Sequence, residues 1–310
     1  MDNASLPQTV RVAAEVRQAL RRGAPVVALE SAVITHGLPR PDNLSLARDM
    51  EATVKSHGAL PSTVGVIEGQ VVVGLSSAQL HTLAYHENPR KISVRDFGPA
   101  LAQRQTGGTT VSGTLVACGL TGIRVFATGG IGGVHRWPPY DVSADLPQLS
   151  RTPTVVVCAG AKAILDLPAT LEYLETLGVP VVGYQTDEFP AFYSAESGLR
   201  VPYRAKDAEE VARIARSHWD LGLKSAILVV VPPPQPLPRG HVEQAVAQAL
   251  EEARAKAVRG FAMTPFLLQR VAELTGHTSV DANLALLKHN AQVAARIADA
   301  LSAQKHLRVV

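Results

Sequence analysis

A lysine follows a strongly apolar segment near the middle of this 310-residue chain. The segment at residues 154–158 has the composition of a buried strand, and Lys162 comes shortly after its end. A lysine amine that leaves water stays partly neutral and nucleophilic, and such an amine forms imines with the aldehyde carbon of an opened sugar. A solvated lysine that begins the next helix would show the same local pattern. Lys162 is therefore a candidate nucleophile whose role depends on which other groups reach it.

A glutamate occupies the same kind of position after another apolar run. Glu30 directly follows residues 26–29, whose sequence Val-Val-Ala-Leu is typical of a buried strand. Partial desolvation at that point would raise the pKa of the carboxyl group and suit it to general-acid catalysis. The alternative is a surface carboxylate that caps the strand end. Glu30 is thus a candidate proton donor.

A glycine-rich turn follows a third apolar run, at residues 124–128. Residues 129–133 read Gly-Gly-Ile-Gly-Gly, and the backbone N–H groups of such a segment can approach an anion closely. His135 and Arg136 add positive charge beside it. The spacing has neither the third glycine of a dinucleotide fingerprint nor the Gly-Lys-Ser/Thr of a P-loop. We interpret the segment as a cradle for a sugar phosphate, with a tight structural turn as the alternative.

Two further groups of charged residues could complete a site. Asp141 and Asp145, with Ser143 between them, could hold a hard divalent cation or sugar hydroxyls, although the same pattern also caps helices. Lys91 lies in a basic segment, residues 90–96, and could either bring a second lysine beside the first or remain solvated. Each group is a weak signal alone and gains weight only if the fold brings the groups together.

Composition gives no support to binding of a nucleic-acid polymer or a membrane surface. The chain is 46% hydrophobic and 18% charged, with a formal net charge of +3 and no long basic run. Aromatic residues make up only 5%, which argues against a base-stacking surface. Cys118 and Cys158 fall in apolar segments and fit buried thiols in a reducing compartment. Neither a secretory signal nor a membrane span is visible, so we expect a cytoplasmic protein.

Strand-like and helix-like patterns alternate along the chain, which predicts an α/β layered fold. Neither a repeat nor an internal boundary is visible, so residues 1–310 are predicted to form one domain. A hairpin turned at residues 68–70 is expected between two of the strands. Strands are expected at residues 26–29, 63–67, 71–75, 124–128, 155–158, 181–184 and 226–231, and helices at residues 8–22, 44–56, 109–120, 266–274, 283–301 and in the segment from 244 onward.

These segments, in this order, resemble the pseudouridine-5'-phosphate glycosidase family, whose relatives include the indigoidine synthase A-like proteins. The matching stretches span nearly the whole chain. They include Val-Val-Ala-Leu-Glu-Ser at 26–31, His-Gly-Leu-Pro at 36–39, Gly-Thr-Thr-Val at 108–111, residues 125–135, Ser-Ala-Asp-Leu at 143–146, Val-Cys-Ala-Gly-Ala-Lys at 157–162, residues 171–176 and 183–186, and Thr-Pro-Phe-Leu-Leu at 264–268. The resemblance implies an α/β/α layered single domain with a central mixed β-sheet, commonly assembled as a homotrimer.

The resemblance also implies chemistry on a C–C bond that joins ribose 5-phosphate to a base. On this basis Lys162 is expected to attack C1' and form an imine with the opened sugar, Glu30 to donate a proton, and Lys91 to bind the substrate. Other positions carry over in the same way: Val111, Ser143 and Asp145 as substrate contacts, Thr128 and His135 at the phosphate end, Asn283 near the base, and Asp141 as the ligand of Mn²⁺ or another divalent cation.

Elementary chemistry agrees with the roles that the resemblance implies. A C-glycosidic bond has no leaving heteroatom, so protonation of a bridging oxygen, as in O-glycosidases, cannot cleave it. An imine with Lys162 supplies an electron sink, and Glu30 can then protonate the departing carbon. Run backward, the same groups join a nucleophilic aromatic carbon to C1'.

The chain departs from the family where the base is expected to bind. Residues 231–235 read Val-Pro-Pro-Pro-Gln in place of Asn-Pro-Ile-Pro-Glu, residues 260–263 read Gly-Phe-Ala-Met where Gly-Lys-Glu is usual, and Trp137 replaces a glycine. Because the sugar positions remain, we hypothesise an altered aglycone and favour a C-glycosynthase that attaches ribose 5-phosphate to an aromatic natural product. Family members in aromatic polyketide pathways, such as alnumycin formation, are the precedent. The alternatives are a pseudouridine-5'-phosphate glycosidase that releases uracil, in which these changes are neutral, and a sugar-phosphate-binding protein without catalysis.

Overall fold

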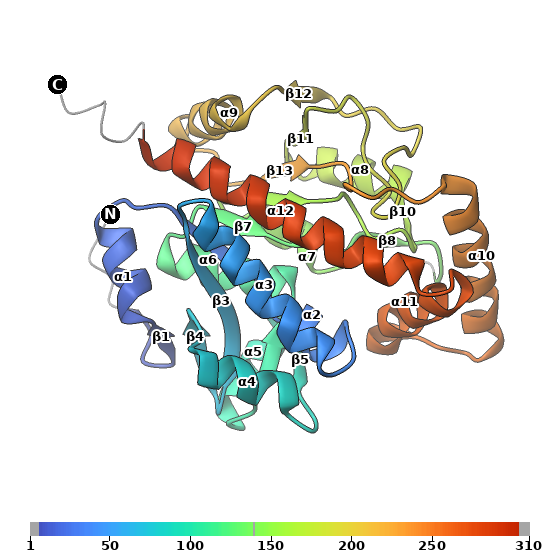
Figure 1. The fold of residues 1–310 in the computed structure, drawn as a ribbon, viewed down its shortest axis with the longest axis horizontal. Helices are drawn as coiled ribbons and strands as arrows, with labels where there is room; N and C mark the ends of the chain where they lie inside the picture. Colours follow the sequence, from blue (N-terminus) through green and yellow to red (C-terminus); the bar gives the residue numbers. More distant parts are fainter. Residues whose placement is uncertain (1–5, 139, 304–310) are drawn as a thin grey trace.

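Short runs of β-branched residues form the strands of one large sheet in the computed structural model, which describes residues 6–138 and 140–303 (Figure 1). Six of its strands are buried at every residue, and five of these have only parallel neighbours, as expected for parallel strands covered on both faces. The strands of the sheet are β1 (Val10–Val12), β2 (Val26–Leu29), β3 (Leu60–Ile67), β4 (Gln70–Val73), β5 (Arg90–Ile92), β6 (Gly107–Thr109), β7 (Val125–Ala127), β9 (Val155–Cys158), β11 (Val181–Tyr184), β12 (Tyr203–Ala205) and β13 (Ile227–Val230).

The strand order along the sheet is β1-β4-β3-β2-β7-β9-β13-β11-β12. From β3 to β12 all neighbours are parallel, whereas β4 and β6 are antiparallel to β3, so the sheet is mixed as predicted. The short strand β5 pairs with β6, and both lie outside this main strand order. A separate two-stranded ribbon consists of β8 (Val134–His135) and β10 (Leu165–Asp166).

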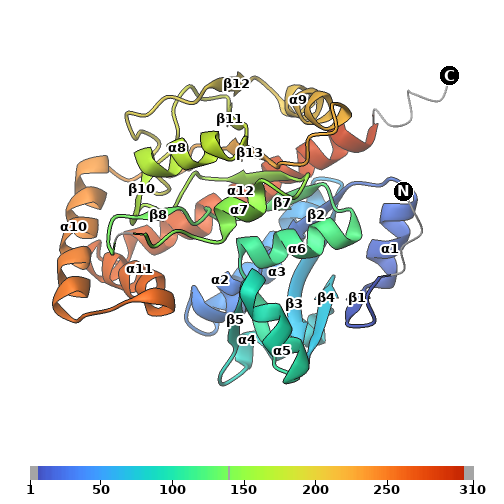
Figure 2. The same ribbon diagram turned by 180° about the vertical axis from the view of Figure 1, so that it is seen from behind.

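Helices cover both faces of the sheet. α12 crosses β2, β7 and β9 on one face with α3 beside it (Figure 1), and α6, α7 and α8 lie on the opposite face (Figure 2). The α/β/α arrangement predicted from the sequence is therefore confirmed. The helices are α1 (Ala14–Arg21), α2 (Ala32–His36), α3 (Asp42–Ser56), α4 (Ser77–Tyr85), α5 (Phe97–Ala102), α6 (Val111–Thr121), α7 (Asp145–Leu149), α8 (Leu167–Thr176), α9 (Ala208–Asp220), α10 (Arg239–Ala255), α11 (Met263–Leu274) and α12 (Thr278–Ala303).

Most predicted elements are present, with two corrections near short strands. The predicted helix at residues 8–22 is wrong at its start, because Val10–Val12 form β1 and pair with β4 before α1 begins. The predicted helix at residues 109–120 begins later, at Val111, because residues 107–109 form β6. The hairpin of β3 and β4 is confirmed, and its turn places Glu68 and Gly69 at φ of 48° and 77°.

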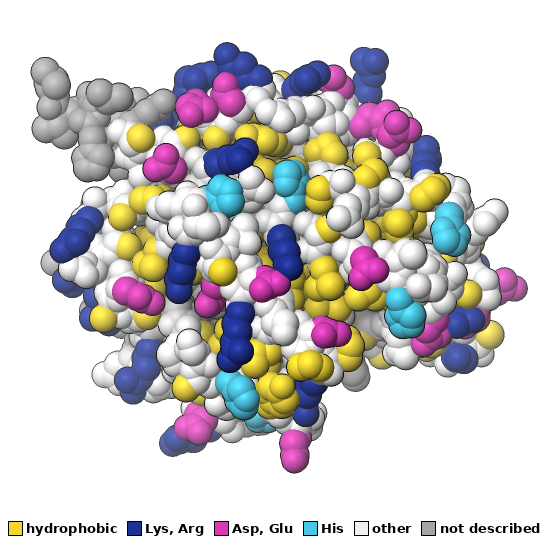
Figure 3. Space-filling view, in the orientation of Figure 1, with side chains coloured by type: hydrophobic (Ala, Val, Ile, Leu, Met, Phe, Trp, Pro, Cys, Tyr) yellow, Lys and Arg dark blue, Asp and Glu magenta, His cyan; other side chains and the backbone are white. Residues whose placement is uncertain are grey.

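The surface of the face that carries α12 and α3 mixes basic and acidic side chains (Figure 3). None of the helices in the described part of the chain combines the length and apolar character needed to cross a membrane.

The sheet order brings three strand ends together. β2, β7 and β9 are adjacent and parallel, so their carboxyl ends meet at one edge of the sheet. Glu30, Thr128 and the segment that leads to Lys162 follow these ends. The fold therefore positions the candidate residues from rigid elements.

Gly108 in β6 lies so close to the start of α2 that a side chain there would clash. A Cβ at this position would come 2.5 Å from the Ser31 carbonyl oxygen and 2.4 Å from Thr35 Oγ1. We expect Gly108→Ala to lower the free energy of unfolding by about 1–3 kcal/mol, because the backbone must shift. Urea denaturation measures this change. Gly240→Ala is the control, since no heavy atom lies within 4 Å of its Cβ position in α10, and an equal loss in both variants would contradict the prediction.

Candidate active site

Two adjacent strands place a carboxyl and a hydroxyl group against each other. Glu30 follows β2 and is only 9% exposed, and Thr128 follows β7 and is fully buried. The Thr128 hydroxyl donates a hydrogen bond to Glu30 Oε1. The predicted acid is therefore held by a neighbouring strand end rather than lying free at the surface.

Burial dominates the electrostatics of Glu30. Desolvation raises the pKa of its carboxyl group, and the charge of Lys162 and the hydrogen bond from Thr128 only partly oppose this. The carboxyl group therefore keeps its proton to higher pH than an ordinary glutamate, as a general acid requires.

Lys162 stands at the end of a tight segment that follows β9. Gly160 has a φ of 84°, and a Cβ there would come 2.3 Å from the Pro190 carbonyl oxygen. Ala161 forms a bridge with Ile131, and Lys162 N donates to Ile131 O at 3.1 Å. The backbone of Lys162 is thus tied to the glycine-rich turn, while its side chain is half-buried.

The second lysine joins the same group. Lys91 lies in β5, is half-buried, and has a pKa lowered first by burial and then by the positive charge of Lys162. Glu30 and Asp145 oppose that shift. Since each of these charges acts on the others, the structure brings the candidate lysines and acids into one cluster.

The glycine-rich turn is packed more tightly than an open anion cradle. A Cβ at Gly130 would come 2.6 Å from the Phe192 ring, and one at Gly132 would come 2.3 Å from Ser143 Oγ. The N–H of Gly132 donates to the Asp145 carboxylate at 2.8 Å. These two glycines therefore serve close packing, and at Gly132 the bound anion is a side chain of the protein itself.

Asp145 links the glycine-rich turn to the start of α6. Its Oδ2 accepts from Gly132, and its Oδ1 accepts from Ser112 N at 2.8 Å, one residue after Val111. Asp145 and Val111 are both buried, and Ser143 Oγ accepts from the Asp145 N–H at 3.2 Å. The predicted substrate-contact residues thus gather at one helix N-terminus, where a negative charge is stabilised.

The backbones of His135 and Asp141 are joined directly after the glycine-rich turn. His135 N donates to Asp141 O at 2.9 Å. The pKa of the imidazole is lowered mainly by burial, against the opposing charge of Asp141. Its Nδ1 is buried and has no hydrogen-bond partner among the described residues. An unpaired ring nitrogen beside a half-buried carboxylate leaves these two side chains free to bind a ligand.

The side chains available as ligands limit how the predicted metal ion could bind. Within residues 6–138 and 140–303, no group of three or more His, Cys, Asp or Glu side chains could hold a metal. The two carboxylate oxygens of Asp145 already accept backbone N–H groups, so Asp141 is the better placed ligand. One carboxylate fits Mg²⁺ or Mn²⁺ only when waters and a substrate phosphate complete the coordination.

The Arg136 side chain is hydrogen-bonded to other parts of the protein. Its guanidinium donates to Glu243 of α10 and to the backbone oxygens of Ala163 and Leu165. Four of its five N–H groups are thus engaged within the protein, which leaves little of the guanidinium to bind a phosphate, and its contribution of positive charge to the cradle stays a prediction.

Asn290 is a polar residue near the site that the sequence reasoning missed. It is 1% exposed, and its Nδ2 donates to Thr128 O at 2.8 Å. Asn283, the predicted base contact, is half-buried on the same helix, α12. The sequence feature that could have identified Asn290 is an amide side chain inside the apolar stripe of α12, between the buried Leu287 and Ala294.

Comparisons with known proteins cover almost the whole chain. The family model described as indigoidine synthase A like protein matches residues 15–300. The pseudouridine-5'-phosphate glycosidase of Chloroflexus aurantiacus is 53% identical over 301 residues, which cover 94% of this chain and 99% of that protein. The enzyme of the same name from Caldanaerobacter subterraneus subsp. tengcongensis is 49% identical over 288 residues, covering 92% and 94%.

Two solved structures share the fold. The prealnumycin C-glycosynthase AlnA, in complex with ribulose 5-phosphate, has a TM-score of 0.90 and 39% identity, covering 97% of this chain and 100% of that chain. An indigoidine synthase A-like protein from Thermotoga maritima has a TM-score of 0.88 and 35% identity at the same coverage. The family model matches most of the chain, and these two glycosidases are about half identical to it in sequence. The chain therefore belongs to the indigoidine synthase A-like family.

Proposed function

We propose that the protein is a pseudouridine-5'-phosphate glycosidase, which cleaves the C–C bond between ribose 5-phosphate and uracil. The observation that carries the proposal is the buried Glu30 carboxyl group beside the Lys162 charge, whose pKa is raised by burial so that it holds its proton to higher pH than an ordinary glutamate. Relatives named for this activity are 47–53% identical to the chain, which supports it. The chain is an enzyme of its family, and the acid and the amine have separate tasks.

Lys162 is the nucleophile in the proposed reaction. Its amine bonds to C1' while the bond from C1' to the ring oxygen breaks, and the proton that the amine loses balances the one that the ring oxygen gains. The nitrogen lone pair then forms a C=N bond as the bond to the base carbon breaks. Glu30 gives its proton to that carbon, so uracil leaves neutral. Water hydrolyses the protonated imine, which releases ribose 5-phosphate, restores the neutral amine and returns one proton to the Glu30 carboxylate.

The remaining residues are proposed to bind and orient the substrate. Lys91 supplies positive charge, and its lowered pKa, caused first by burial and then by Lys162, marks it as part of the cluster. The polar side chains in and beside the glycine-rich turn contact the sugar phosphate, and Asn283 on α12 contacts the base. The proposed substrate-binding set is Lys91, Val111, Thr128, His135, Ser143, Asp145 and Asn283.

A divalent cation, Mn²⁺ in the first instance, is proposed to bind at Asp141. Such an ion would neutralise phosphate charge when bound, and His135 lies beside the same carboxylate. A homotrimer and a cytoplasmic location stay predictions.

A C-glycosynthase is the second candidate, and the sequence alone favoured it. The AlnA structure supports a shared sugar chemistry at 39% identity. Two of the altered positions, however, are buried and one faces solvent: Val231 is 1% exposed and Met263 is fully buried, whereas Gln235 is exposed. Substitutions that pack inside the core or face solvent fit repacking better than a reshaped aglycone site. The glycosidase is therefore the better supported candidate.

Borohydride reduction in the presence of ribose 5-phosphate should trap a sugar on Lys162. The imine becomes a stable amine on reduction, so peptide mass analysis locates it. We expect the label on Lys162 and its loss in Lys162→Met, whereas Lys55→Ala should label normally. An unlabelled Lys162 at saturating sugar would refute the nucleophile assignment.

Glu30→Gln should reduce release of uracil about 10²- to 10⁴-fold, because an amide cannot donate the proton, while the sugar adduct still forms. In the parent enzyme kcat should decline as pH rises through the raised pKa of Glu30, since the reaction uses the protonated form. That alkaline decline should vanish in Glu30→Gln.

The matched control for this acid is Glu51→Gln. Glu51 accepts a hydrogen bond from Thr63 Oγ1 at 2.6 Å, as Glu30 does from Thr128, but it belongs to α3. Turnover should be unchanged in this variant, and undiminished turnover in Glu30→Gln would remove the acid role.

Uracil release from pseudouridine 5'-phosphate, followed by absorbance, separates the two candidate functions. We expect turnover comparable to that of the Chloroflexus aurantiacus relative measured side by side. A chain that traps ribose 5-phosphate on Lys162 but leaves pseudouridine 5'-phosphate intact would instead support the synthase.

A further inference from the structure

Arg136 has its donors engaged by two elements of the protein. Its Nε donates to Leu165 O at 2.9 Å and its Nη2 to Ala163 O at 3.3 Å. Nη1 and Nη2 bond the two carboxylate oxygens of Glu243 at 2.9 and 3.0 Å. The guanidinium therefore joins α10 to the segment that follows Lys162.

The segment between Lys162 and Leu165 is a turn. Leu165 N donates to Lys162 O at 3.0 Å, and Leu165 then pairs with His135 in the β8–β10 ribbon. Arg136 bonds one carbonyl inside this turn and one at its end. Its hydrogen bonds thus fix the piece of backbone from which the Lys162 side chain projects.

We propose that Arg136 is a positioning residue that holds Lys162 in its reactive orientation. This rests on the proposed function in that Lys162 is taken as the nucleophile. Ala163 and Leu165 are buried, so their carbonyl groups need protein donors once Arg136 is removed. A lysine at 136 keeps the charge but lacks the planar fork that reaches both carbonyls and a carboxylate at once.

Glu243 completes the arrangement by orienting the guanidinium. The hydrogen bonds from Arg136 lower the pKa of Glu243, so the carboxylate stays ionised. Both side chains are partly exposed, at 27% and 40%, and ion pairs of that kind add little stability. The ion pair therefore contributes more to the orientation of the Arg136 guanidinium than to the stability of the fold.

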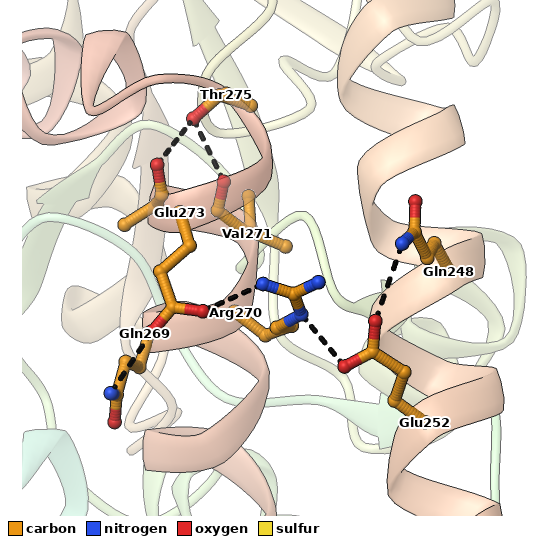
Figure 4. Close-up of polar contacts among 8 residues, drawn as sticks. Gln248, Glu252, Gln269, Arg270, Val271, Glu273 and Thr275 are labelled. Atoms are coloured by element: carbon orange, nitrogen blue, oxygen red, sulfur yellow. Dashed lines mark hydrogen bonds and ion pairs between the residues drawn. The ribbon is translucent and has the colours of Figure 1, made fainter.

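A second arginine offers a matched control. Arg270 of α11 bonds Glu252 of α10 at 2.7 Å and Glu273 at 2.7 Å (Figure 4). Its exposure, 29%, is close to that of Arg136. This network also joins α10 to another element, but none of its hydrogen bonds reaches the Lys162 turn.

The test compares Arg136→Lys with Arg270→Lys. The rate of borohydride-trapped adduct formation should fall about 10- to 100-fold in Arg136→Lys and stay at the parent value in Arg270→Lys, because small displacements of a reacting group are costly. The KM for pseudouridine 5'-phosphate should change little in both. A raised KM with an unchanged trapping rate would instead identify Arg136 as a phosphate ligand, and equal trapping losses in both variants would show a general effect on stability; either result overturns the proposal.

Glu243→Gln with Glu252→Gln covers the case in which Arg136→Lys fails to fold. The trapping rate should fall in Glu243→Gln alone, since only that change loosens the guanidinium beside Lys162, and equal rates in the two variants overturn the proposal.

Acetylation of Lys162 by acetic anhydride, read by peptide mass, needs no sugar and separates this proposal from the proposed function. If the parent enzyme traps no sugar, the function fails, whereas a Lys162 acetylation rate that differs between Arg136→Lys and Arg270→Lys still supports the positioning role. Equal acetylation rates overturn it.

Discussion

A carboxyl group that is buried beside a lysine charge is the constraint on which the site depends. Burial alone would make an ionised Glu30 costly, and the Lys162 charge and the Thr128 hydroxyl offset only part of that cost. The same Lys162 charge, after burial, lowers the pKa of Lys91. The Lys162 charge therefore influences the protonation of both Glu30 and Lys91, so moving Lys162 would change the chemistry that these two groups can perform.

The strand register of the sheet fixes the positions of Glu30 and Thr128 relative to each other. Leu29 pairs with Ala127, and Ala127 pairs with Val157, so Glu30 and Thr128 leave the sheet at the same level. The hydrogen bond from Thr128 N to Val157 O continues this registration past the strand ends. Groups carried by buried parallel strands vary little in separation, which suits the proposed reaction, in which the amine bonds to C1' and the acid protonates the base carbon attached to it.

Much of this arrangement could be predicted from the sequence because it has local signals. The apolar runs before Glu30 and Lys162 indicate buried strands, and the rule that ligands bind at carboxyl ends of parallel strands brings the two residues together. The β1 strand could not be predicted, because its three residues also fit the helical spacing of the segment that follows.

Residues whose partners are distant in the sequence were also beyond prediction. Arg136 and Glu243 are 107 positions apart, and Asn290 and Thr128 are 162 apart. Neither pair leaves a periodic pattern, so the sequence could not say that Arg136 bonds the protein rather than a phosphate. The amide of Asn290 faces two carbonyl oxygens, which fixes its orientation and leaves its Oδ1 buried without a hydrogen-bond partner in the part of the chain that the structure describes. An unsatisfied acceptor costs about 1–3 kcal/mol, so a residue kept there for packing alone would be expected to be apolar.

The direction of the reaction follows from a different argument. An enzyme lowers the barrier equally both ways, so the roles proposed for Lys162 and Glu30 would serve cleavage and synthesis alike, and only the groups that receive the base can separate the two functions. Of the positions that differ from the family, Val231 and Met263 lie in the core, and the Trp137 ring contacts the guanidinium groups of Arg254 and Arg259. These side chains are already buried or stacked on neighbouring cations, so their apolar character is accounted for by contacts within the protein. That argument supports the proposed release of uracil, because it removes the reason to invoke a larger aromatic base.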